Sequence, residues 1–402
     1  MSRALQDVAI VGAGMVGAAL ALDLAQRGFD VALVESRAPA AWSAADEVDL
    51  RVVALAPSSS GLLRRLEVWH DVESRRANAY ARMHVWDALA PGSLSFDAAD
   101  EGVAALGHIV ENRLIQAVLW QALGRSGAIT LHCPARVVST DVTASDALAR
   151  SGDAARTLAL DDGTRIGARL VVAADGADSA LRAMLGVAVS DHDYAQRAVV
   201  AHVATGRAHE DTAWQRFLPQ ATVAFLPLAD GRSSIVWSLP DAEAARILAL
   251  DDAAFCAELG AALDFRLGTI TATSARAAFP LRMRLADRYV APRFALVGDA
   301  AHVVHPLAGQ GVNLGLRDAA LLAELLAQAR ADKLDIADAT VLRRYERRRR
   351  SDNALSAHAF DLIQRGFGSA SPTLAAIRAA GLALVDRVTP LKHLFARHAA
   401  GG

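Results

Sequence analysis

Short apolar runs recur along the chain, and each ends at a glycine or an acidic residue. They occupy residues 8–11, 31–34, 170–174 and 294–297 and are rich in valine and other small apolar side chains. Runs of this kind are typical of strands buried on both faces, as in a parallel sheet covered by helices. Between the first two, residues 18–27 read as a helix, and Gly28 stands where a glycine would end it. The pattern predicts an α/β fold built on a mostly parallel sheet.

A different pattern occupies the middle of the chain. Residues 222–228 and 234–239 read as two strands joined through Asp230-Gly231, which is a hairpin signal. In the second strand Ile235, Trp237 and Leu239 alternate with residues 234, 236 and 238, so one face is strongly apolar. That face would either line a binding pocket or pack against helices. From about residue 340 the chain reads as helices.

The first apolar run leads into a glycine-rich turn. Gly12, Gly14 and Gly17 form a GxGxxG motif between the first strand and the first helix, and Glu35 follows the second strand. Such glycines allow a tight turn, close approach to a pyrophosphate and close helix packing, while the helix N-terminus favours an anion. Glu35 would accept hydrogen bonds from ribose hydroxyls and would repel a 2′-phosphate. The unit predicts dinucleotide binding but does not separate FAD from NAD.

Two later segments end strands in Asp-Gly or Gly-Asp. Asp175-Gly176 follows the run at 170–174, and Ser179 or Asp178 would cap a short helix after it. Gly298-Asp299 follows the run at 294–297. It leads into a loop and a long helix, with candidate site residues at Pro306, Gly309, Gly311, Val312 and Asn313. Glycines and a helix N-terminus at one point stabilise negative charge, which suits the anionic edge of a reduced flavin.

Composition and charge exclude several classes. The 402 residues are 53% hydrophobic, which excludes general disorder. The net charge of −2 argues against a protein that binds nucleic acid through a basic surface. Two cysteines indicate a reducing compartment. No run is long enough to span a bilayer and no leader pattern opens the chain, so a cytoplasmic location is expected. His302 and His305 have no acid or cysteine at ligand spacing, so no metal site is expected.

Together these motifs resemble the FAD-dependent aromatic hydroxylases of the para-hydroxybenzoate hydroxylase type, and within them the hydroxylases of ubiquinone biosynthesis. The similar segments extend over nearly the whole chain: 106–112, 224–228, 234–237, 298–315 and 344–346. The resemblance implies a Rossmann-like FAD-binding domain formed by 1–72, 100–182 and 280–340. It further implies a β-sheet substrate domain formed by 73–99 and 183–279, followed by a helical region at 341–402.

The resemblance also implies roles for single residues. Gly12, Gly14, Gly17 and Glu35 would hold the AMP half of FAD, and Asp175 would serve both FAD and the nicotinamide cofactor. The remaining positions would lie near the flavin or its ribityl chain: Arg51, Gly298, Asp299, Pro306, Gly309, Gly311, Val312 and Asn313. Many relatives carry Arg or Gln where Glu111 falls. A carboxylate there cannot donate to a phosphate, and Arg113 would replace it.

The implied activity is hydroxylation of the ring of a polyprenylated phenol or benzoquinol. FAD would stay bound, NAD(P)H would act transiently, and O₂ would react through a flavin C4a-hydroperoxide. No side chain need act as a catalyst, and Ile235, Trp237 and Leu239 would line the substrate pocket. The resemblance is compatible with a quinone-synthesis protein assembly. The arginine run at 343–350 is typical of a solvated helix face, and peripheral contact with anionic lipid is the alternative, which a polyprenyl substrate would favour. The resemblance leaves the ring position open between C5 and C6.

Other functions fit the sequence less well. A hydroxylase of small phenolics and a non-catalytic flavin-binding member of a quinone-synthesis assembly remain alternatives. A halogenase of this scaffold usually carries a WxWxIP segment, which this sequence lacks. An NAD-dependent dehydrogenase would leave the motif at 298–315 unexplained.

Overall fold

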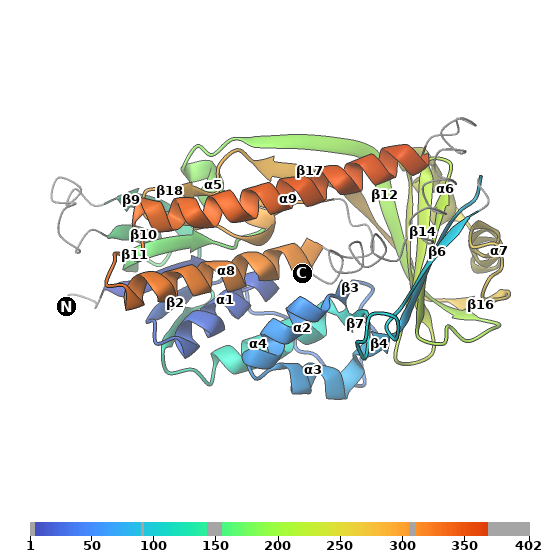
Figure 1. The fold of residues 1–402 in the computed structure, drawn as a ribbon, viewed down its shortest axis with the longest axis horizontal. Helices are drawn as coiled ribbons and strands as arrows, with labels where there is room; N and C mark the ends of the chain where they lie inside the picture. The colour runs from blue at the N-terminus through green and yellow to red at the C-terminus, as the bar shows by residue number, and fades with distance from the viewer. Residues whose placement is uncertain (1–4, 90–91, 143–154, 305–310, 369–402) are drawn as a thin grey trace.

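A mostly parallel sheet forms the core of one half of the molecule (Figure 1). The structure is a computed structural model that describes residues 5–89, 92–142, 155–304 and 311–368. The parallel strands, in spatial order, are β19 (Phe294–Leu296), β11 (Arg165–Ala173), β1 (Gln6–Val11), β2 (Val31–Val34) and β8 (Ile129–His132). Antiparallel strands extend it: β18 (Val290–Ala291), β10 (Arg156–Leu160) and β9 (Val137–Val142).

The strands predicted from the apolar runs are confirmed, and their C-terminal ends agree to within one residue, although β1 begins two residues and β11 five residues earlier than predicted. All four residues of β2 are buried, as expected of a strand covered on both faces. The helix after the glycine motif is α1 (Met15–Gln26), and Gly28 has a φ of +79° just beyond it. Other helices complete this half: α2 (Pro57–Arg65), α3 (Trp69–Arg76), α4 (Asn112–Leu123), α5 (Ala180–Met184) and α8 (Gly311–Ala331).

A larger, mostly antiparallel sheet forms the other half. Its strands, in spatial order, are β20 (His302–Val303), β17 (Ala277–Ala286), β12 (Val189–Thr205), β15 (Ser233–Pro240), β14 (Ala221–Pro227), β13 (Thr212–Leu218), β5 (Arg82–Asp87) and β6 (Ser93–Asp97), with β16 (Ile270–Thr273) beside β12. The predicted hairpin is confirmed, since β14 pairs with β15 and Gly231 has a φ of +85°. Helices α6 (Asp241–Ala249) and α7 (Asp252–Ala262) cover the outer face (Figure 1).

A small sheet lies between the two halves. It contains β3 (Val52–Leu55), β7 (Gly107–Glu111) and β4 (Asn78–Tyr80). The predicted domain boundaries do not coincide with the sheets at every point. β4 falls within the predicted substrate segment 73–99 but pairs with β7, and β17 begins before the predicted boundary at 280.

The helix α9 (Ala339–Gly368) runs along the molecule from the first sheet toward the second (Figure 1). Its anchors are polar as well as apolar: the Tyr345 hydroxyl donates to the Leu296 carbonyl at 2.8 Å, and Glu346 accepts from the Tyr289 backbone N–H at 2.7 Å. In the arginine run, Arg349 is buried, whereas Arg348 and Arg350 are exposed. Within the described ranges, no helix combines the length and the apolar character needed to cross a membrane.

Candidate active site at the junction of the two halves

A cavity of about 710 Å³ lies where the carboxyl ends of the parallel strands meet the large sheet. The parallel half supplies residues from the turn after β1, the segment before β3, the turn after β11 and the start of α8. The large sheet supplies residues of β12, β15 and β17. The lining includes Gly14, Met15, Leu50, Arg51, Asn112, Gly176, Val200, Val236, Phe279, Leu281, Asp299, Gly311 and Val312. Ligands of open α/β sheets bind at this end of the strands.

The GxGxxG glycines play distinct steric roles. Gly12 has a φ of +100°, and an added Cβ would collide with the Ala174 carbonyl; a Cβ on Gly17 would collide with the Gly12 carbonyl. A Cβ on Gly14 would meet no protein atom and would enter the cavity. Gly14 is also the residue that precedes α1, which has no side-chain cap. Free N–H groups therefore face a space shaped to admit a pyrophosphate.

Glu35 directly follows β2, beside this turn. Its Oε2 accepts the Ala13 N–H at 2.7 Å, and its Oε1 accepts from the Ser36 hydroxyl and the Arg37 N–H. The carboxylate thus fixes the glycine turn relative to β2. Glu35 does not appear in the cavity lining, and it lies partly exposed at the adenosine end that the motif predicts.

Asp299 lies in a 3₁₀ turn, Gly298–Ala300, that follows β19. Its side chain lines the cavity and is accessible to water from that side. The protein on its other sides desolvates the carboxylate and raises its pKa, and His302 and Arg51 act in the opposite direction. Gly298 has a φ of +60°, and an added Cβ would press on Val16 of α1. The turn is therefore held close to the start of α1.

A buried polar network lies beneath this turn. Asp318 of α8 accepts hydrogen bonds from the Gly298 N–H at 3.0 Å and from His302 Nε2 at 2.6 Å. Its other oxygen accepts from Arg349 Nε at 2.6 Å and Asn353 Nδ2 at 3.1 Å, both on α9. Against the desolvation that burial imposes, the neighbouring His302 and Arg349 lower the pKa of Asp318 to about 2. The network ties α9 to the turn that carries Asp299.

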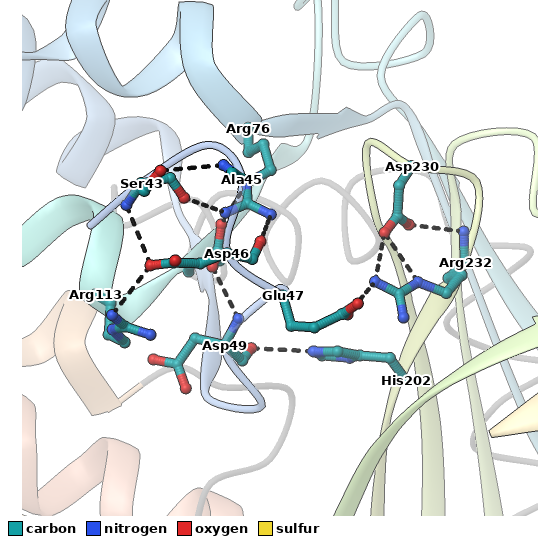
Figure 2. A network of polar contacts seen from close by, with 11 residues as sticks. Ser43, Ala45, Asp46, Glu47, Asp49, Arg76, Arg113, His202, Asp230 and Arg232 are labelled. Atoms are coloured by element: carbon teal, nitrogen blue, oxygen red, sulfur yellow. Dashed lines mark hydrogen bonds and ion pairs between the residues drawn. The ribbon is translucent and has the colours of Figure 1, made fainter. Parts of the chain in front are cut away.

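Arg51 lines the cavity and follows a loop that both halves hold. Figure 2 shows the polar contacts of that loop. The His202 ring, on the large sheet, bonds to the Asp49 carbonyl at 3.0 Å, and Arg232 pairs with Glu47 at 3.5 Å. From the parallel half, Arg76 donates to the carbonyls of Ser43 and Asp46. Burial lowers the pKa of His202. The guanidinium of Arg51 also lies over the Phe279 ring, 5.4 Å from its centre.

The side chains of Glu111 and Arg113 both bind the loop that precedes Arg51. Glu111 is buried, pairs with Arg76 at 3.0 Å and accepts the Asp49 N–H at 2.8 Å. Arg113 donates to the Ala41 carbonyl at 2.8 Å and lies 3.4 Å from Asp46. Neither lines the cavity. The residue between them, Asn112, does line it, and its Oδ1 is buried without a hydrogen-bond partner among the described residues.

Asp175 lies between Ala174 and Gly176, which both line the cavity. Its Oδ2 accepts the Leu181 N–H at 3.2 Å, whereas its Oδ1 is buried and lacks a partner within the described ranges. Arg182 joins this turn to the Asp299 turn, because it donates to the carbonyls of Ala177 and Ala300 at 2.7 and 2.8 Å. Ser179 caps α5 by accepting the Arg182 N–H, as one of the two predicted caps.

Gly311 and Val312 line the cavity at the start of α8, and Asn313 does not. The Asn313 side chain accepts from the Ala56 N–H at 2.9 Å and donates to the Ala54 carbonyl at 2.8 Å. It therefore joins α8 to the segment between β3 and α2. Any cofactor contact from Asn313 would use its backbone. Pro306 and Gly309 lie outside the described residues.

The prediction that Ile235, Trp237 and Leu239 line the substrate pocket is corrected by the structure. All three are 5% exposed or less and pack with Phe255 and Leu259 of α7, on the side of the sheet away from the cavity. The alternating residues of β15, Ser234 and Val236, line the cavity instead. Because successive side chains of a strand point to opposite faces, the apolar set could serve only one of them.

Sequence reasoning missed the network and the sheet wall. Asp318 could have been noticed, since it sits on the apolar stripe of α8 with Leu314, Leu322 and Leu325, where a charge needs a partner. Phe279, Leu281 and Val200 carried no local signal. Within the described part of the chain, no three His, Cys, Asp or Glu side chains group as a metal site would require.

Comparison with known proteins agrees with this geometry. Residues 6–356 match the FAD binding domain family. The chain is 40% identical over 401 residues to 3-demethoxyubiquinol 3-hydroxylase of Escherichia coli (strain K12), with 100% of both chains covered. It is 38% identical to ubiquinone hydroxylase UbiL of Rhodospirillum rubrum, covering 98% of this chain and 89% of the relative. It is 32% identical to human mitochondrial ubiquinone biosynthesis monooxygenase COQ6, covering 96% and 90%.

Solved structures share the fold at lower identity. Pseudomonas aeruginosa PqsL in complex with 2-aminobenzoylacetate has a TM-score of 0.76 at 22% identity, covering 94% of this chain and 99% of that one. The p-nitrophenol 4-monooxygenase PnpA from Pseudomonas putida DLL-E4 has a TM-score of 0.76 at 19% identity, covering 99% and 98%. With the glycine turn, the Asp299 turn and the full-length relatives in agreement, the chain belongs to the family of FAD-dependent monooxygenases that includes the ubiquinone-biosynthesis hydroxylases.

Proposed function

We propose that the protein hydroxylates the aromatic ring of a polyprenylated phenol or benzoquinol during ubiquinone assembly. The observation that carries this proposal is the 40% identity to 3-demethoxyubiquinol 3-hydroxylase along the entire length of both chains. The proposal covers either open ring position, C5 or C6. In it, the mostly parallel half holds FAD and the large sheet holds the substrate.

The cofactor contacts are part of the proposal. The turn of Gly12, Gly14 and Gly17 and the N-terminus of α1 would hold the pyrophosphate, with Glu35 at the adenosine ribose and Asp299 at the ribityl chain. Gly311 and Val312, with the backbone of Asn313, would meet the ring system where the dipole of α8 favours negative charge. Arg51, Asn112 and Asp175 would complete the set. The open space beside Gly14 and Gly311 and the unpartnered oxygens of Asn112 and Asp175 support this assignment.

When bound, FAD supplies the activation of O₂ and the transfer of one oxygen atom, with NAD(P)H as the electron donor. The balance is one ring C–H, one O₂, one NAD(P)H and one proton giving one ring C–OH, one water and NAD(P)⁺. The chain's part is to orient the ring and exclude water. Val200, Val236 and Leu281 provide an apolar wall, which suits a ring with a prenyl tail because each buried CH₂ gains about 0.8 kcal/mol.

A substrate with a polyprenyl tail resides in the membrane, so we also propose peripheral contact with the membrane surface. Peripheral contact is supported by exposed arginines on α9, among them Arg343, Arg344 and Arg347. Basic residues near an anionic surface each contribute about 1 kcal/mol. A place in a quinone-synthesis assembly is compatible with the same substrate.

The test uses purified protein loaded with FAD. A demethoxyubiquinol with a short prenyl tail, NADH or NADPH, and ¹⁸O₂ should yield a product that carries one ¹⁸O on the ring. Fragmentation of that product identifies the ring position. NAD(P)H oxidation that yields only hydrogen peroxide, with prenylated phenols and quinols alike, would refute the proposed substrate class.

A further inference from the structure

Helix α8 runs between α2 and α9 (Figure 1). Residues of these three helices line a second hollow. It has a volume of about 740 Å³ and shares no lining residue with the cofactor cavity. Its charged lining consists of Arg27, Arg65, Arg317, Arg348, Arg349, Glu324 and Asp352. We name this hollow the arginine groove. Five cations against two anions make it a strongly basic site on a chain whose net charge is −2.

The groove's arginines differ in how their charge is used. Arg27 pairs with Asp23 at 2.7 Å, and Arg349 pairs with Asp318 and with Asp352. The side chains of Arg65, Arg317 and Arg348 make no hydrogen bond or ion pair with any described residue. Three helices thus contribute one guanidinium each that has no direct partner among the described residues.

Arg317 is the most unusual of the three. It is half-buried, its Nε is buried without a partner among the described residues, and burial lowers its pKa. Taking an unpaired guanidinium out of water is unfavourable unless an anion compensates it. Ser58, on the first turn of α2, lines the same groove and has a buried hydroxyl that likewise lacks a partner within the described ranges.

The remaining lining is apolar. Leu62, Leu316, Ala320 and Leu321 form a wall beside the cations. The volume lies within the range of small-molecule sites and far exceeds that of a single phosphate ion. Guanidinium groups suit phosphate because their planar fork donates two parallel hydrogen bonds. We propose that the arginine groove binds an organic phosphate, with the phosphate on Arg65, Arg317 and Arg348 and an apolar body against the leucines.

The arginine groove is connected to the cofactor cavity by a chain of hydrogen bonds. Arg349 lines the groove, and its Nε donates to Asp318, whose other oxygen accepts the Gly298 N–H. The proposed ligand would therefore lie beside the network beneath the Asp299 turn. The proposal does not depend on which substrate the enzyme hydroxylates.

The experiment titrates FAD-saturated protein with inorganic pyrophosphate and with geranyl diphosphate, by calorimetry, while the flavin spectrum reports that FAD stays bound. Both probes should bind saturably. Geranyl diphosphate should bind at least about tenfold more tightly, because its tail meets the leucines. Vesicles of phosphatidylcholine with and without phosphatidylglycerol form a separate arm, which separates a lipid headgroup from a free phosphate.

Three variants decide the outcome. Arg317→Gln should weaken binding by at least about tenfold, because a hydrogen bond to a charged group is lost. Arg65→Gln, at an exposed position that tolerates substitution, should weaken it about threefold. Arg125→Gln is the matched control, an exposed arginine in the turn after α4 and outside the groove, and should bind as the parent does.

The melting temperature of Arg317→Gln provides a second test of the proposed site. Without ligand, this variant should melt at the same temperature as the parent or higher, because a half-buried guanidinium that forms no ion pair has been removed. Loss of vesicle binding in Arg317→Gln and Arg65→Gln alone would place the phosphate in a lipid headgroup. No saturable binding in any arm, equal loss in Arg125→Gln, or a lower melting temperature for Arg317→Gln would overturn the proposal.

Discussion

His302 Nε2 and Asp318 Oδ2 lie 2.6 Å apart in a part of the core where both side chains are at most 1% exposed. The same carboxylate binds the Gly298 N–H and the Arg349 guanidinium. A buried carboxylate with four donors is favourable only while all of them are present. The position of the Asp299 turn therefore depends on residues of α8 and α9 that never reach the cavity.

Asp318→Asn should lower the free energy of unfolding by about 3–5 kcal/mol, because it leaves the buried Arg349 with only the exposed Asp352 as a counter-charge. Urea unfolding measures the change. Glu324→Gln, at an exposed position on the same helix, should change it by less than about 0.5 kcal/mol. Equal stability of the two variants would mean that the Asp318 network contributes little.

The acid dependence of stability should report the same carboxylate. Its pKa in the folded protein is about 2, below the ordinary 3.8, so the stabilisation is present above pH 4 and is lost as the pH falls from 4 to 2. The contribution is about 2 kcal/mol. Urea unfolding at a series of pH values should show a flatter acid limb for Asp318→Asn than for the parent. Parallel limbs would assign the acid transition to other groups.

Asp299→Ala should weaken FAD binding by about one to two decades without unfolding the chain, because a charge-assisted hydrogen bond is lost. Flavin fluorescence during titration of the apoprotein measures the affinity. Asp287→Ala, an exposed acid outside the cavity, is the control. Parental affinity in Asp299→Ala would remove Asp299 from the cofactor site.

Two neighbouring residues of β15 should respond in opposite ways. Val236→Gln should raise the KM for a prenylated quinol severalfold with little loss of stability, because Val236 lines the cavity. Trp237→Ala should cost about 3–5 kcal/mol of stability and leave KM unchanged in the folded protein, because Trp237 packs beneath α7. Steady-state kinetics and urea unfolding distinguish the two effects, and the reverse pattern would restore the original pocket assignment.

The loop that carries Arg51 should depend on Glu111 and much less on Arg113. Glu111→Gln removes a buried ion pair with Arg76 and should cost about 2 kcal/mol or more. Arg113→Gln removes exposed contacts and should cost under about 1 kcal/mol. Thermal unfolding ranks them. A larger loss of FAD affinity in Arg113→Gln than in Glu111→Gln would return Arg113 to the cofactor contacts.

The sequence by itself determined the local units. The runs ending at Gly12, Asp175 and Gly298 specify strands that lead into glycine turns, because a buried strand and a φ above zero both leave marks in residue type. The resemblance along the full length predicted the family and its cofactor, FAD. These features depend on neighbours in the chain, so they can be recognised without the fold.

Only the tertiary structure decided which face and which partner each residue meets. The alternation of Ile235 and Trp237 predicts an apolar face, but the packing of α6 and α7 assigns it to the core and leaves Val236 at the cavity. Glu111 meets Arg76, and Asp318 meets His302 and Arg349, across separations of 35, 16 and 31 residues. Such pairs form because burial makes an unpaired charge costly, and the partner is set by how helices and sheets pack, which no local pattern encodes.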